Sequence, residues 1–459
     1  MFFSHIYSPG LAHSSYVVGG KKECIVVDPS RDIQKYLDQA KSFGLPITGI
    51  IETHLHADFI SGHMDLAEAT GAAIYAAASA KCEYPHIAML EGETIRHDTL
   101  EISMLDTPGH TPESAVFMIT DLERSSDDPV LVFTGDTVLV GDVGRPDLFP
   151  DIKFDLARKL YASIRKMELL PDHVEVYPAH GMGSLCGRSL SAKLWTTMGT
   201  EKKYNYAFQI HPEERFVSEI LDSMPEAPDH FSRCSAINRK GPVKLSDLPQ
   251  PKALNPKEFK HLMDQGHAVI DARSFVEYSG AHIPNSFSIP IQGKFSTFAG
   301  WVIPFDVPLL LVVESQKEMQ TALMGMQAVG HDQTIGYLEG GITRWINAGM
   351  RTHRIESMAV HELHEMLQKP DSCTVLDTRL RSEWLEGHIK DTVHAPAPDI
   401  RTRYPEWDPE KPIITFCNTS NRSIIAASIL KQKGFKHVIN MVGGTTAWEA
   451  AGYSLIKGS

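Results

Sequence analysis

The sequence predicts an α/β protein of several domains, and two patterns carry this prediction. Up to about residue 235, short runs typical of β-strands alternate with runs typical of helices. Beyond residue 252, the chain contains an internal repeat in which each copy reads strand, turn, helix, strand, helix. The 459 residues also exceed what one hydrophobic core serves, since a domain takes roughly 100 to 200 residues. We expect three domains, at residues 1–240, 252–352 and 353–459.

The composition is that of an ordinary soluble globular protein, with 42% apolar and 22% charged residues. A formal charge of −13 without clusters of lysine and arginine argues against nucleic acid as the main partner. The N-terminus lacks the basic and apolar regions of a signal peptide, and no run approaches ~18 consecutive apolar residues. The six cysteines have no paired spacing that would suggest disulfides or a zinc ribbon. We expect a cytoplasmic protein without a membrane segment.

The first region begins with a predicted hairpin and continues with alternating strands and helices. The apolar pattern predicts strands at 15–19, 24–28, 47–51, 73–77 and 130–133 and helices at 32–43 and 64–69. The strand at 47–51 ends directly before His54, His56 and Asp58, three ligand-type residues at alternate positions. Such spacing at the mouth of a sheet can hold a metal that solvent still reaches.

Two later turns add further ligand-type residues. His110 ends a Thr-Pro-Gly-His turn, and Asp136 lies in a Thr-Gly-Asp-Thr turn, each directly after a strand. An isolated His-x-His pair is more often structural, but three converging turns weaken that alternative. The combination resembles the metallo-β-lactamase superfamily, whose αββα fold holds its metal ligands on loops at one edge of two packed sheets.

The motif departs from the His-x-His-x-Asp-His of the superfamily's two-zinc hydrolases. Phe59 occupies the last histidine position, so a second metal site, for which Asp58 and His180 remain, lacks a ligand. We therefore expect one metal per chain. Two histidines and one carboxylate with open positions suit Fe(II) and O2 chemistry, although a mononuclear zinc hydrolase has the same ligand set.

The Gly-Asp-Thr around Asp136 and the Gly-Asp-Val-Gly-Arg-Pro-Asp run that contains Arg145 resemble the persulfide dioxygenases. The resemblance implies one Fe(II) per chain, held by His54, His110 and Asp136, with His56 bound to the iron or adjacent to it. It also implies that Arg145 contacts the substrate. The alternative for Arg145 is an ordinary ion pair with a neighbouring aspartate.

Three other residues of this region have no motif of their own. Cys186 follows the turn at His180 and could act as an auxiliary sulfur-handling thiol near the metal, which is the less favoured interpretation. We expect His13 and His63 to be structural.

From residue 223 to 255 proline becomes frequent and apolar periodicity is lost, a composition typical of a linker.

The internal repeat begins with an Asp-x-Arg pattern at Asp271 that recurs 106 positions later at Asp377. A closing Gly-Gly-x-x-x-Trp pattern that ends at Trp345 recurs 103 positions later at Trp448. So constant a shift indicates a duplicated domain, each copy a small α/β domain with a mostly parallel sheet. The shared pattern resembles the rhodanese family and extends from about residue 252 to the end.

The last copy contains a reactive pattern. A predicted strand at 411–416 opens onto Cys417, and a Cys-Asn-Thr-Ser-Asn-Arg run precedes a predicted helix at 424–433. A cysteine among loop amides at a helix N-terminus is stabilised as the reactive thiolate. The rhodanese resemblance implies that Cys417 accepts sulfane sulfur as a persulfide and that Arg422 helps to bind an anionic substrate. The alternatives are an inert cysteine or a phosphatase loop, which is one residue longer in related phosphatases.

The central copy lacks these residues. Val313 stands opposite Cys417 and Glu318 opposite Arg422, so the central domain cannot perform the same chemistry. We expect it to be a spacer or docking domain.

The whole domain order resembles the bacterial multidomain persulfide dioxygenase-sulfurtransferases. This resemblance implies an iron enzyme that oxidises a low-molecular-weight persulfide, such as glutathione persulfide, with O2 to sulfite. Rhodanese transfer to sulfite would then give thiosulfate, in sulfide detoxification, and we expect a homo-oligomer. The rivals are a zinc-dependent thioester hydrolase like glyoxalase II and a non-catalytic sulfur-relay or sensor protein.

Overall fold

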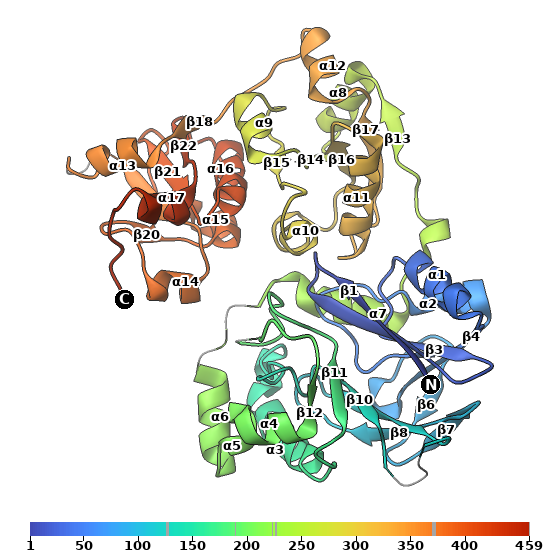
Figure 1. Ribbon diagram of the computed structural model, residues 1–459. Helices are drawn as coiled ribbons and strands as arrows, with labels where there is room; N and C mark the ends of the chain where they lie inside the picture. The colour runs from blue at the N-terminus through green and yellow to red at the C-terminus, as the bar shows by residue number, and fades with distance from the viewer. Residues whose placement is uncertain (125–127, 189, 223, 225–226, 370–372, 459) are drawn as a thin grey trace. The chain divides into compact units, whose positions relative to one another are not determined.

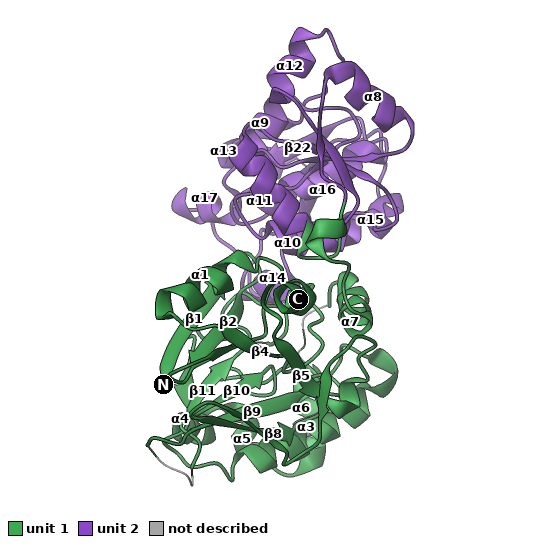
Figure 2. Ribbon diagram, turned by 90° about the vertical axis from the view of Figure 1, so that its right-hand side faces the viewer, with its two compact units in different colours: residues 1–248, 327–330 green, residues 249–326, 331–459 purple. Residues whose placement is uncertain are grey.

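The computed structural model describes residues 1–459 except 125–127, 189, 223, 225–226, 370–372 and 459. The chain forms two compact units (Figure 2), one of residues 1–248 and 327–330 and the other of residues 249–326 and 331–459. The domain limits expected at 240, 252 and 352 are finer than this division and stay a prediction. Among the described residues, no helix combines the length and the apolar character needed to cross a membrane.

The first unit begins with a six-stranded sheet in which spatial order follows chain order. The pairs β1–β2 and β2–β3 are antiparallel, whereas the pairs from β3 to β6 are parallel. The predicted hairpin and the strands predicted at 47–51 and 73–77 are confirmed. The strands are β1 (Phe2–Ser8), β2 (His13–Gly19), β3 (Cys24–Val27), β4 (Ile47–Ile51), β5 (Ala73–Ala77) and β6 (Ile87–Met89).

A second six-stranded sheet has the spatial order β12-β11-β10-β9-β8-β7. Its neighbouring strands are antiparallel except for the pair β10–β11. The strands are β7 (Thr94–His97), β8 (Leu100–Asp106), β9 (Ala115–Asp121), β10 (Leu131–Gly135), β11 (Glu175–Pro178) and β12 (Thr196–Thr197).

The two sheets pack face to face, because apolar side chains from both enter one core. Val27 and Ile51 of the first sheet lie in the same buried cluster as Phe117 and Phe133 of the second. Helices α1 and α2 cover the outer face of the first sheet, and α3 and α6 cover that of the second (Figure 1). This is the predicted αββα arrangement. The helices are α1 (Gln34–Phe43), α2 (His63–Thr70), α3 (Lys153–Met167), α4 (Met198–Tyr204), α5 (Tyr206–Gln209) and α6 (Glu213–Asp222).

The linker predicted for residues 223–255 is wrong in its middle part. Helix α7 (His230–Lys240) forms there and buries Phe231 and Cys234. Prolines lie on either side of this helix and not inside it, so the proline count gave no warning of the helix. Residues 223 and 225–226 of the predicted linker lie outside the described residues.

The second unit contains two five-stranded sheets whose strands are all parallel. Their spatial orders are β13-β17-β16-β14-β15 and β18-β22-β21-β19-β20, so every strand of one sheet has a counterpart in the other. The predicted duplication is confirmed.

The central domain consists of β13 (Lys252–Leu254), α8 (Pro256–Asp264), β14 (Ala268–Asp271), α9 (Phe275–Gly280), β15 (Phe287–Ser288), α10 (Phe295–Val302), β16 (Leu309–Val312), α11 (Gln316–Gln327), β17 (Thr334–Leu338) and α12 (Gly341–Asn347). The last domain consists of β18 (Glu356–Met358), α13 (Val360–Met366), β19 (Thr374–Asp377), α14 (Arg381–Glu386), β20 (Val393–His394), α15 (Ile400–Arg403), β21 (Ile413–Phe416), α16 (Asn421–Gln432), β22 (Val438–Met441) and α17 (Gly444–Ala450).

Candidate functional site

Three of the predicted ligand residues lie together, each on a turn that follows a strand of the first unit. Nε2 of His54 lies 3.9 Å and Nε2 of His110 lies 3.3 Å from Oδ2 of Asp136. All three side chains are buried, and one ligand atom of each lies within 4.8 Å of the others. In the part of the chain that the structure describes, neither Nε2 atom has a hydrogen-bond partner. Because an unsatisfied buried nitrogen is costly, this convergence on a carboxylate fits a bound metal ion.

The other ring nitrogen of each histidine is held by the protein. Nδ1 of His110 donates to the backbone carbonyl of Arg145 at 2.9 Å, and because a carbonyl only accepts, this nitrogen carries the proton. Nδ1 of His54 lies 3.0 Å from Oγ1 of Thr53, which in turn donates to Oδ2 of Asp28 at 2.9 Å. Nε2 is therefore the atom that each ring leaves available for a metal ion, and these contacts fix the ring orientations.

The surroundings keep these groups in the ionisation states that bind a cation. Burial, together with the neighbouring histidines, lowers the pKa of His54 well below its ordinary value, and burial lowers the pKa of His110. Burial alone would raise the pKa of Asp136, but the charge and hydrogen bond of His180 outweigh it, so this pKa lies below its ordinary value. Neutral imidazoles beside an ionised carboxylate form a donor set for a divalent metal.

A second group of ligand-type residues, His56, Asp58 and His180, adjoins the first. Nδ1 of His180 lies 2.8 Å from Oδ1 of Asp136, and its Nε2 lies 2.9 Å from Oδ2 of Asp58. His56 faces Asp28, with 3.3 Å between Nε2 and Oδ1. Asp58 and His180, the predicted remnants of a second metal site, are thus close together and form an ion pair.

Phe59 lies beside this second group and is completely buried. Its ring centroid is 4.4 Å from that of His56 and 4.2 Å from that of His13. The phenyl ring fills space and offers no ligand atom. His63 belongs to neither group and lies 3.4 Å from Glu52. A structural role for His13 and His63 stays a prediction.

Arg145 is buried and occupied by its own neighbours. Its Nε donates to Oδ1 of Asp147 at 2.7 Å and its Nη2 donates to Oδ2 at 2.8 Å. Its Nη1 also donates to the carbonyl of Leu185 at 3.1 Å. The structure thus shows the ion pair that the sequence offered as the alternative, and contact between Arg145 and a substrate stays a prediction.

Cys186 is buried beside the same cluster. Its sulfur lies within 4.8 Å of ligand atoms of Asp136 and His180. Burial, followed by the negative charges of Asp58 and Asp136, raises the pKa of Cys186 well above its ordinary value. The side chain is therefore a neutral thiol here, and a reactive role for it stays a prediction.

Helix α7 fastens the histidine loop, by which we mean residues 54–63. Nδ2 of Asn238 donates to the carbonyls of His56 and Phe59, at 2.8 Å each. Oδ1 of the same side chain accepts from the backbone N–H of Ser61 at 2.9 Å. A single buried amide thus satisfies three backbone groups of the loop and fixes its path.

In the last domain, Cys417 directly follows β21 and is buried. Helix α16 begins at Asn421, three residues before its predicted start, so Arg422 lies in its first turn. Both terminal nitrogens of Arg422 donate to the carboxylate of Glu383. Nδ2 of Asn418 donates to the same carboxylate at 2.7 Å. A single acidic side chain therefore orients two residues of the six-residue loop.

Sequence reasoning missed four residues that hold these sites: Asp28, Thr53, Asn238 and Glu383. Asp28 follows a buried strand as Asp136 does, and this shared position is the signal that could have identified it. Glu383 belongs to the repeated pattern, but the pattern does not indicate its partner. No comparable sequence pattern identifies Asn238, because it lies on α7, in a segment whose composition predicted a linker.

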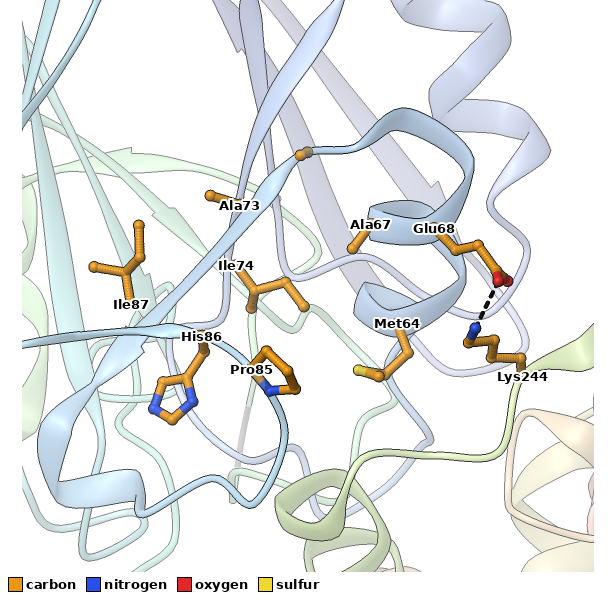
Figure 3. A pocket seen from close by; sticks show the side chains of 10 residues that line it. Met64, Ala67, Glu68, Ala73, Ile74, Pro85, His86, Ile87 and Lys244 are labelled. Carbon is orange, nitrogen blue, oxygen red and sulfur yellow. Dashed lines mark hydrogen bonds and ion pairs between the residues drawn. The ribbon is translucent and has the colours of Figure 1, made fainter.

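The first unit also has a pocket of about 550 Å³ lined by residues of α2 and β5 (Figure 3). Met64, Ile74 and Ile87 give it an apolar wall, and Glu68 and Lys244 form an ion pair at its edge. None of its lining residues belongs to the histidine and aspartate groups described above. The pocket is therefore separate from the candidate metal site.

Comparison with known proteins relates both units to families. The metallo-beta-lactamase superfamily matches residues 8–180, and the rhodanese-like domain matches residues 255–348 and 359–451. A solved structure of a metallo-beta-lactamase from Staphylococcus aureus is 31% identical and has a TM-score of 0.68, covering 74% of this chain and 99% of that one. The chain belongs to the metallo-β-lactamase superfamily. Behind its metallo-β-lactamase domain it carries two rhodanese-like domains, as the repeat predicted.

Two relatives of the metallo-β-lactamase domain have different activities. A hydroxyacylglutathione hydrolase of Methylococcus capsulatus is 30% identical over 223 residues, which cover 48% of this chain and 72% of that protein. The mitochondrial persulfide dioxygenase ETHE1 of Mus musculus is 29% identical over 186 residues, which cover 38% of this chain and 66% of that protein. Since these similarities are equal in degree, the reaction must be inferred from the site.

Proposed function

We propose that the chain is an iron-dependent persulfide dioxygenase joined to a sulfurtransferase. The metallo-β-lactamase domain converts a low-molecular-weight persulfide, such as glutathione persulfide, with O2 and water into the free thiol and sulfite. The last rhodanese-like domain transfers sulfane sulfur to sulfite and gives thiosulfate. The two domains would thus share a substrate, and one would consume the product of the other.

One observation supports the dioxygenase most directly: a three-ligand set beside a second group that has phenylalanine in place of a further histidine. His54, His110 and Asp136 offer two imidazoles and one carboxylate, which leaves positions open on a single metal. Such a donor set suits Fe(II) that binds both a sulfur substrate and O2. Phe59 contributes no ligand where a two-metal hydrolase of the superfamily has histidine.

The residues around the metal ligands have defined tasks in this proposal. Thr53 and the carbonyl of Arg145 fix the two histidine rings. His180, between Asp136 and Asp58, holds a proton beside the site, because those two carboxylates raise its pKa well above the ordinary value although burial opposes this. The proposed reaction needs ordered ligands, and these contacts order them.

Sulfur transfer proceeds by double displacement at Cys417. The Cys417 thiolate attacks the outer sulfur of the donor persulfide, the donor S–S bond breaks, and the donor leaves as a thiol. The sulfur of sulfite then attacks the outer sulfur of the Cys417 persulfide and releases thiosulfate and the free thiolate. Arg422, in the first turn of α16, would help to bind the anions.

The test of the dioxygenase is metal content and O2 uptake of protein purified without oxygen. We expect about one iron per chain, O2 consumption on addition of glutathione persulfide, and formation of sulfite. His54→Ala should abolish iron binding and O2 uptake, whereas His173→Ala, at an exposed histidine of the same domain, should change neither. Zinc alone, with no O2 uptake after iron reconstitution, would contradict the proposal.

The second candidate is a zinc-dependent thioester hydrolase like the hydroxyacylglutathione hydrolases. The closeness of His56, Asp58 and His180 supports it, because these residues could contribute to a second metal site. Rapid hydrolysis of S-lactoylglutathione by the zinc-loaded protein, without O2 uptake by the iron-loaded protein, would favour this candidate. This candidate would be excluded if the zinc-loaded protein did not hydrolyse S-lactoylglutathione and if this thioester did not change O2 uptake by the iron-loaded protein.

A further inference from the structure

Four residues of the central rhodanese-like domain belong to the first unit. Residues 327–330 end α11 and form the turn behind it, within the second family match, yet they are part of the same compact unit as the histidine loop (Figure 2). We call them the α11 turn. The backbone carbonyl of Ala328 in this turn accepts from the N–H of Ile60 in the histidine loop at 2.8 Å. The α11 turn therefore binds the loop that carries proposed metal ligands.

This hydrogen bond complements those of Asn238. The amide of Asn238 donates to the carbonyl of Phe59 and accepts from the N–H of Ser61, the residues on either side of Ile60. The α11 turn supplies the acceptor for the residue between them. Three consecutive residues of the histidine loop are thus held, two from α7 and one from the α11 turn.

The held residues touch the proposed ligands. The ring centroid of Phe59, the neighbour of Ile60, lies 4.4 Å from that of His56. The ring centroid of His56 lies in turn 4.1 Å from that of His54. Because close-packed side chains transmit displacements, a shift of Ile60 would be passed to His54 through these rings.

The α11 turn is itself held by side chains of the first unit. Nη1 of Arg31, which is buried, donates to the carbonyl of Gln327 at 2.9 Å. Nη2 of Arg233 donates to the carbonyl of Val329 at 3.3 Å. Three successive carbonyls at the end of α11 thus accept hydrogen bonds from the first unit, and the end of a helix is where carbonyls lack partners within the helix.

The equivalent turn of the last domain is polar and exposed. In both copies a glycine, Gly330 or Gly434, binds the carbonyl three residues before it through its N–H, at 3.1 and 3.2 Å. The residue before this glycine is Val329 in the central domain and Lys433 in the last domain. Val329 is completely buried, whereas Lys433 is exposed. Since the two domains share one fold, the fold does not require an apolar residue here, and Val329 serves the contact with the first unit.

The two glycines differ in the same way. Both have positive φ, so an added side chain strains the backbone at either position. A Cβ on Gly434 would have nothing within 4 Å. A Cβ on Gly330 would lie 3.2 Å from the side chain of Ile237 in α7 and 3.5 Å from that of Ile60. The glycines thus form a matched pair, in which only the central one adjoins the histidine loop.

We propose that the α11 turn is a positioning element of the histidine loop, so that the cysteine-less copy completes the metallo-β-lactamase domain. Ala328 acts through its backbone carbonyl and Val329 through its buried side chain. The central copy is then more than a spacer, because it supplies a support for another domain's loop. Only the expected effect on metal affinity rests on the proposed metal site.

Hydrogen exchange of the full-length protein tests the positioning directly. Val329→Lys puts a charge at a buried position, so the turn should leave its place and the N–H of Ile60 should exchange at least about tenfold faster. Peptides from β8 of the same domain should exchange as before. Val329→Ile, which keeps an apolar side chain, should retain the slow exchange. Lys433→Val, at the equivalent exposed position, should leave the histidine loop unchanged.

The glycine pair gives a milder test in case Val329→Lys does not fold. Gly330→Ala and Gly434→Ala should lower thermal stability alike through the strain at positive φ. Only Gly330→Ala should speed exchange of the histidine loop, by about threefold. Equal exchange of the loop in Gly330→Ala and the unsubstituted protein, or the same acceleration in Gly434→Ala, would overturn the inference.

Titration with Co(II) after removal of bound metal measures the consequence for the site. Val329→Lys should weaken Co(II) binding about tenfold and change the visible absorption of the bound ion, because misplaced ligands alter its geometry. Lys433→Val should change neither. Unaltered Co(II) affinity despite faster loop exchange would overturn the link from the turn to the metal ligands. Absence of Co(II) binding by the unsubstituted protein would overturn the proposed metal site, and the exchange data would still decide the positioning role.

Discussion

The two rhodanese-like domains share a scaffold but differ in one turn. In both, a buried aspartate at the end of a central strand binds an arginine two residues later, Asp271 with Arg273 and Asp377 with Arg379. The Nη2–Oδ2 distance is 2.6 Å in each pair, and each arginine also donates to a backbone carbonyl eight residues away at 2.8 Å. These contacts join the ends of β14 and β19 to the residues that directly follow α9 and α14.

The difference lies in the turn between the neighbouring strand and its helix. In the last domain Cys417 follows β21, and Arg422 is bound by Glu383. In the central domain Val313 follows β16, and the carboxylate of Glu318 accepts from the backbone N–H of Glu314. The comparison indicates that the fold depends on the strands and the Asp–Arg pair, whereas the proposed sulfur transfer depends on a single turn. A rhodanese-like domain can therefore lack the residues for sulfur transfer and still keep the fold.

The largest effect should come from exchanging the residues after the strand. Cys417→Ser should reduce sulfur transfer about 10³-fold or more, because an essential nucleophile is removed, and leave O2 uptake unchanged. Val313→Cys should create no transfer activity, because Glu314 and Glu318 surround that position with negative charge and no arginine follows. Assays of thiosulfate formation check both. Detection of a persulfide on the cysteine introduced at position 313 would contradict this difference between the two turns.

If the Asp–Arg pair serves the fold, its removal should lower the free energy of unfolding by a similar amount in both rhodanese-like domains. Asp271→Ala and Asp377→Ala each remove the buried carboxylate that binds a buried guanidinium, which costs about 3–5 kcal/mol of folding free energy. Urea unfolding of the full chain, followed by domain-specific proteolysis, measures each loss. Markedly different losses would mean that the pair serves chemistry in the last domain and not the scaffold.

Two equivalent glycines test how tightly each turn is built. A Cβ on Gly444 would lie 2.0 Å from the carbonyl oxygen of Cys417, whereas one on Gly341 would lie 2.8 Å from a side-chain oxygen of Glu314. Both glycines have positive φ. Gly444→Ala should therefore cost about 3 kcal/mol and Gly341→Ala about 1 kcal/mol, since the backbone carbonyl of Val313 lies 3.0 Å from the second Cβ, whereas that of Cys417 lies 2.0 Å from the first. Equal shifts in thermal unfolding would argue against a tighter turn around Cys417.

The smallest effect concerns pH and the Glu383–Arg422 pair. Burial would raise the pKa of Glu383, but the hydrogen bond and charge of Arg422 outweigh it, so the folded pKa lies below the ordinary value. A depressed carboxylate pKa contributes stability above the unfolded pKa of about 4.3, and that contribution disappears as the pH falls through the folded value. Glu383→Gln should flatten the acid side of the stability profile. The central domain, where Glu277 has no such arginine, is the internal reference.

The parts of the molecule that sequence could predict are those with local signals. Strand 47–51, the duplication and the convergence of His54, His110 and Asp136 follow from apolar runs and from ligand residues placed at strand ends. The start of α16 at Asn421 and the existence of α7 could not be predicted in the same way. Both depend on distant packing partners, and although Asp229 and Ser420 are residue types that favour N-caps, neither side chain caps its helix. The Arg145–Asp147 pair was one of two open alternatives, since spacing alone does not distinguish an ion pair from a substrate contact.

The hold of α7 on the histidine loop has a consequence for biosynthesis. Asn238 lies 182 positions after His56, whose carbonyl it binds. A ribosome that adds roughly 5 to 20 residues per second takes roughly 10 to 40 s to cover that distance. During this interval the loop exists without the amide that fixes its path, so the proposed metal ligands reach their final arrangement only after α7 has emerged. Metal acquisition would then be a late event in the life of the nascent chain, after most of the metallo-β-lactamase domain has been made.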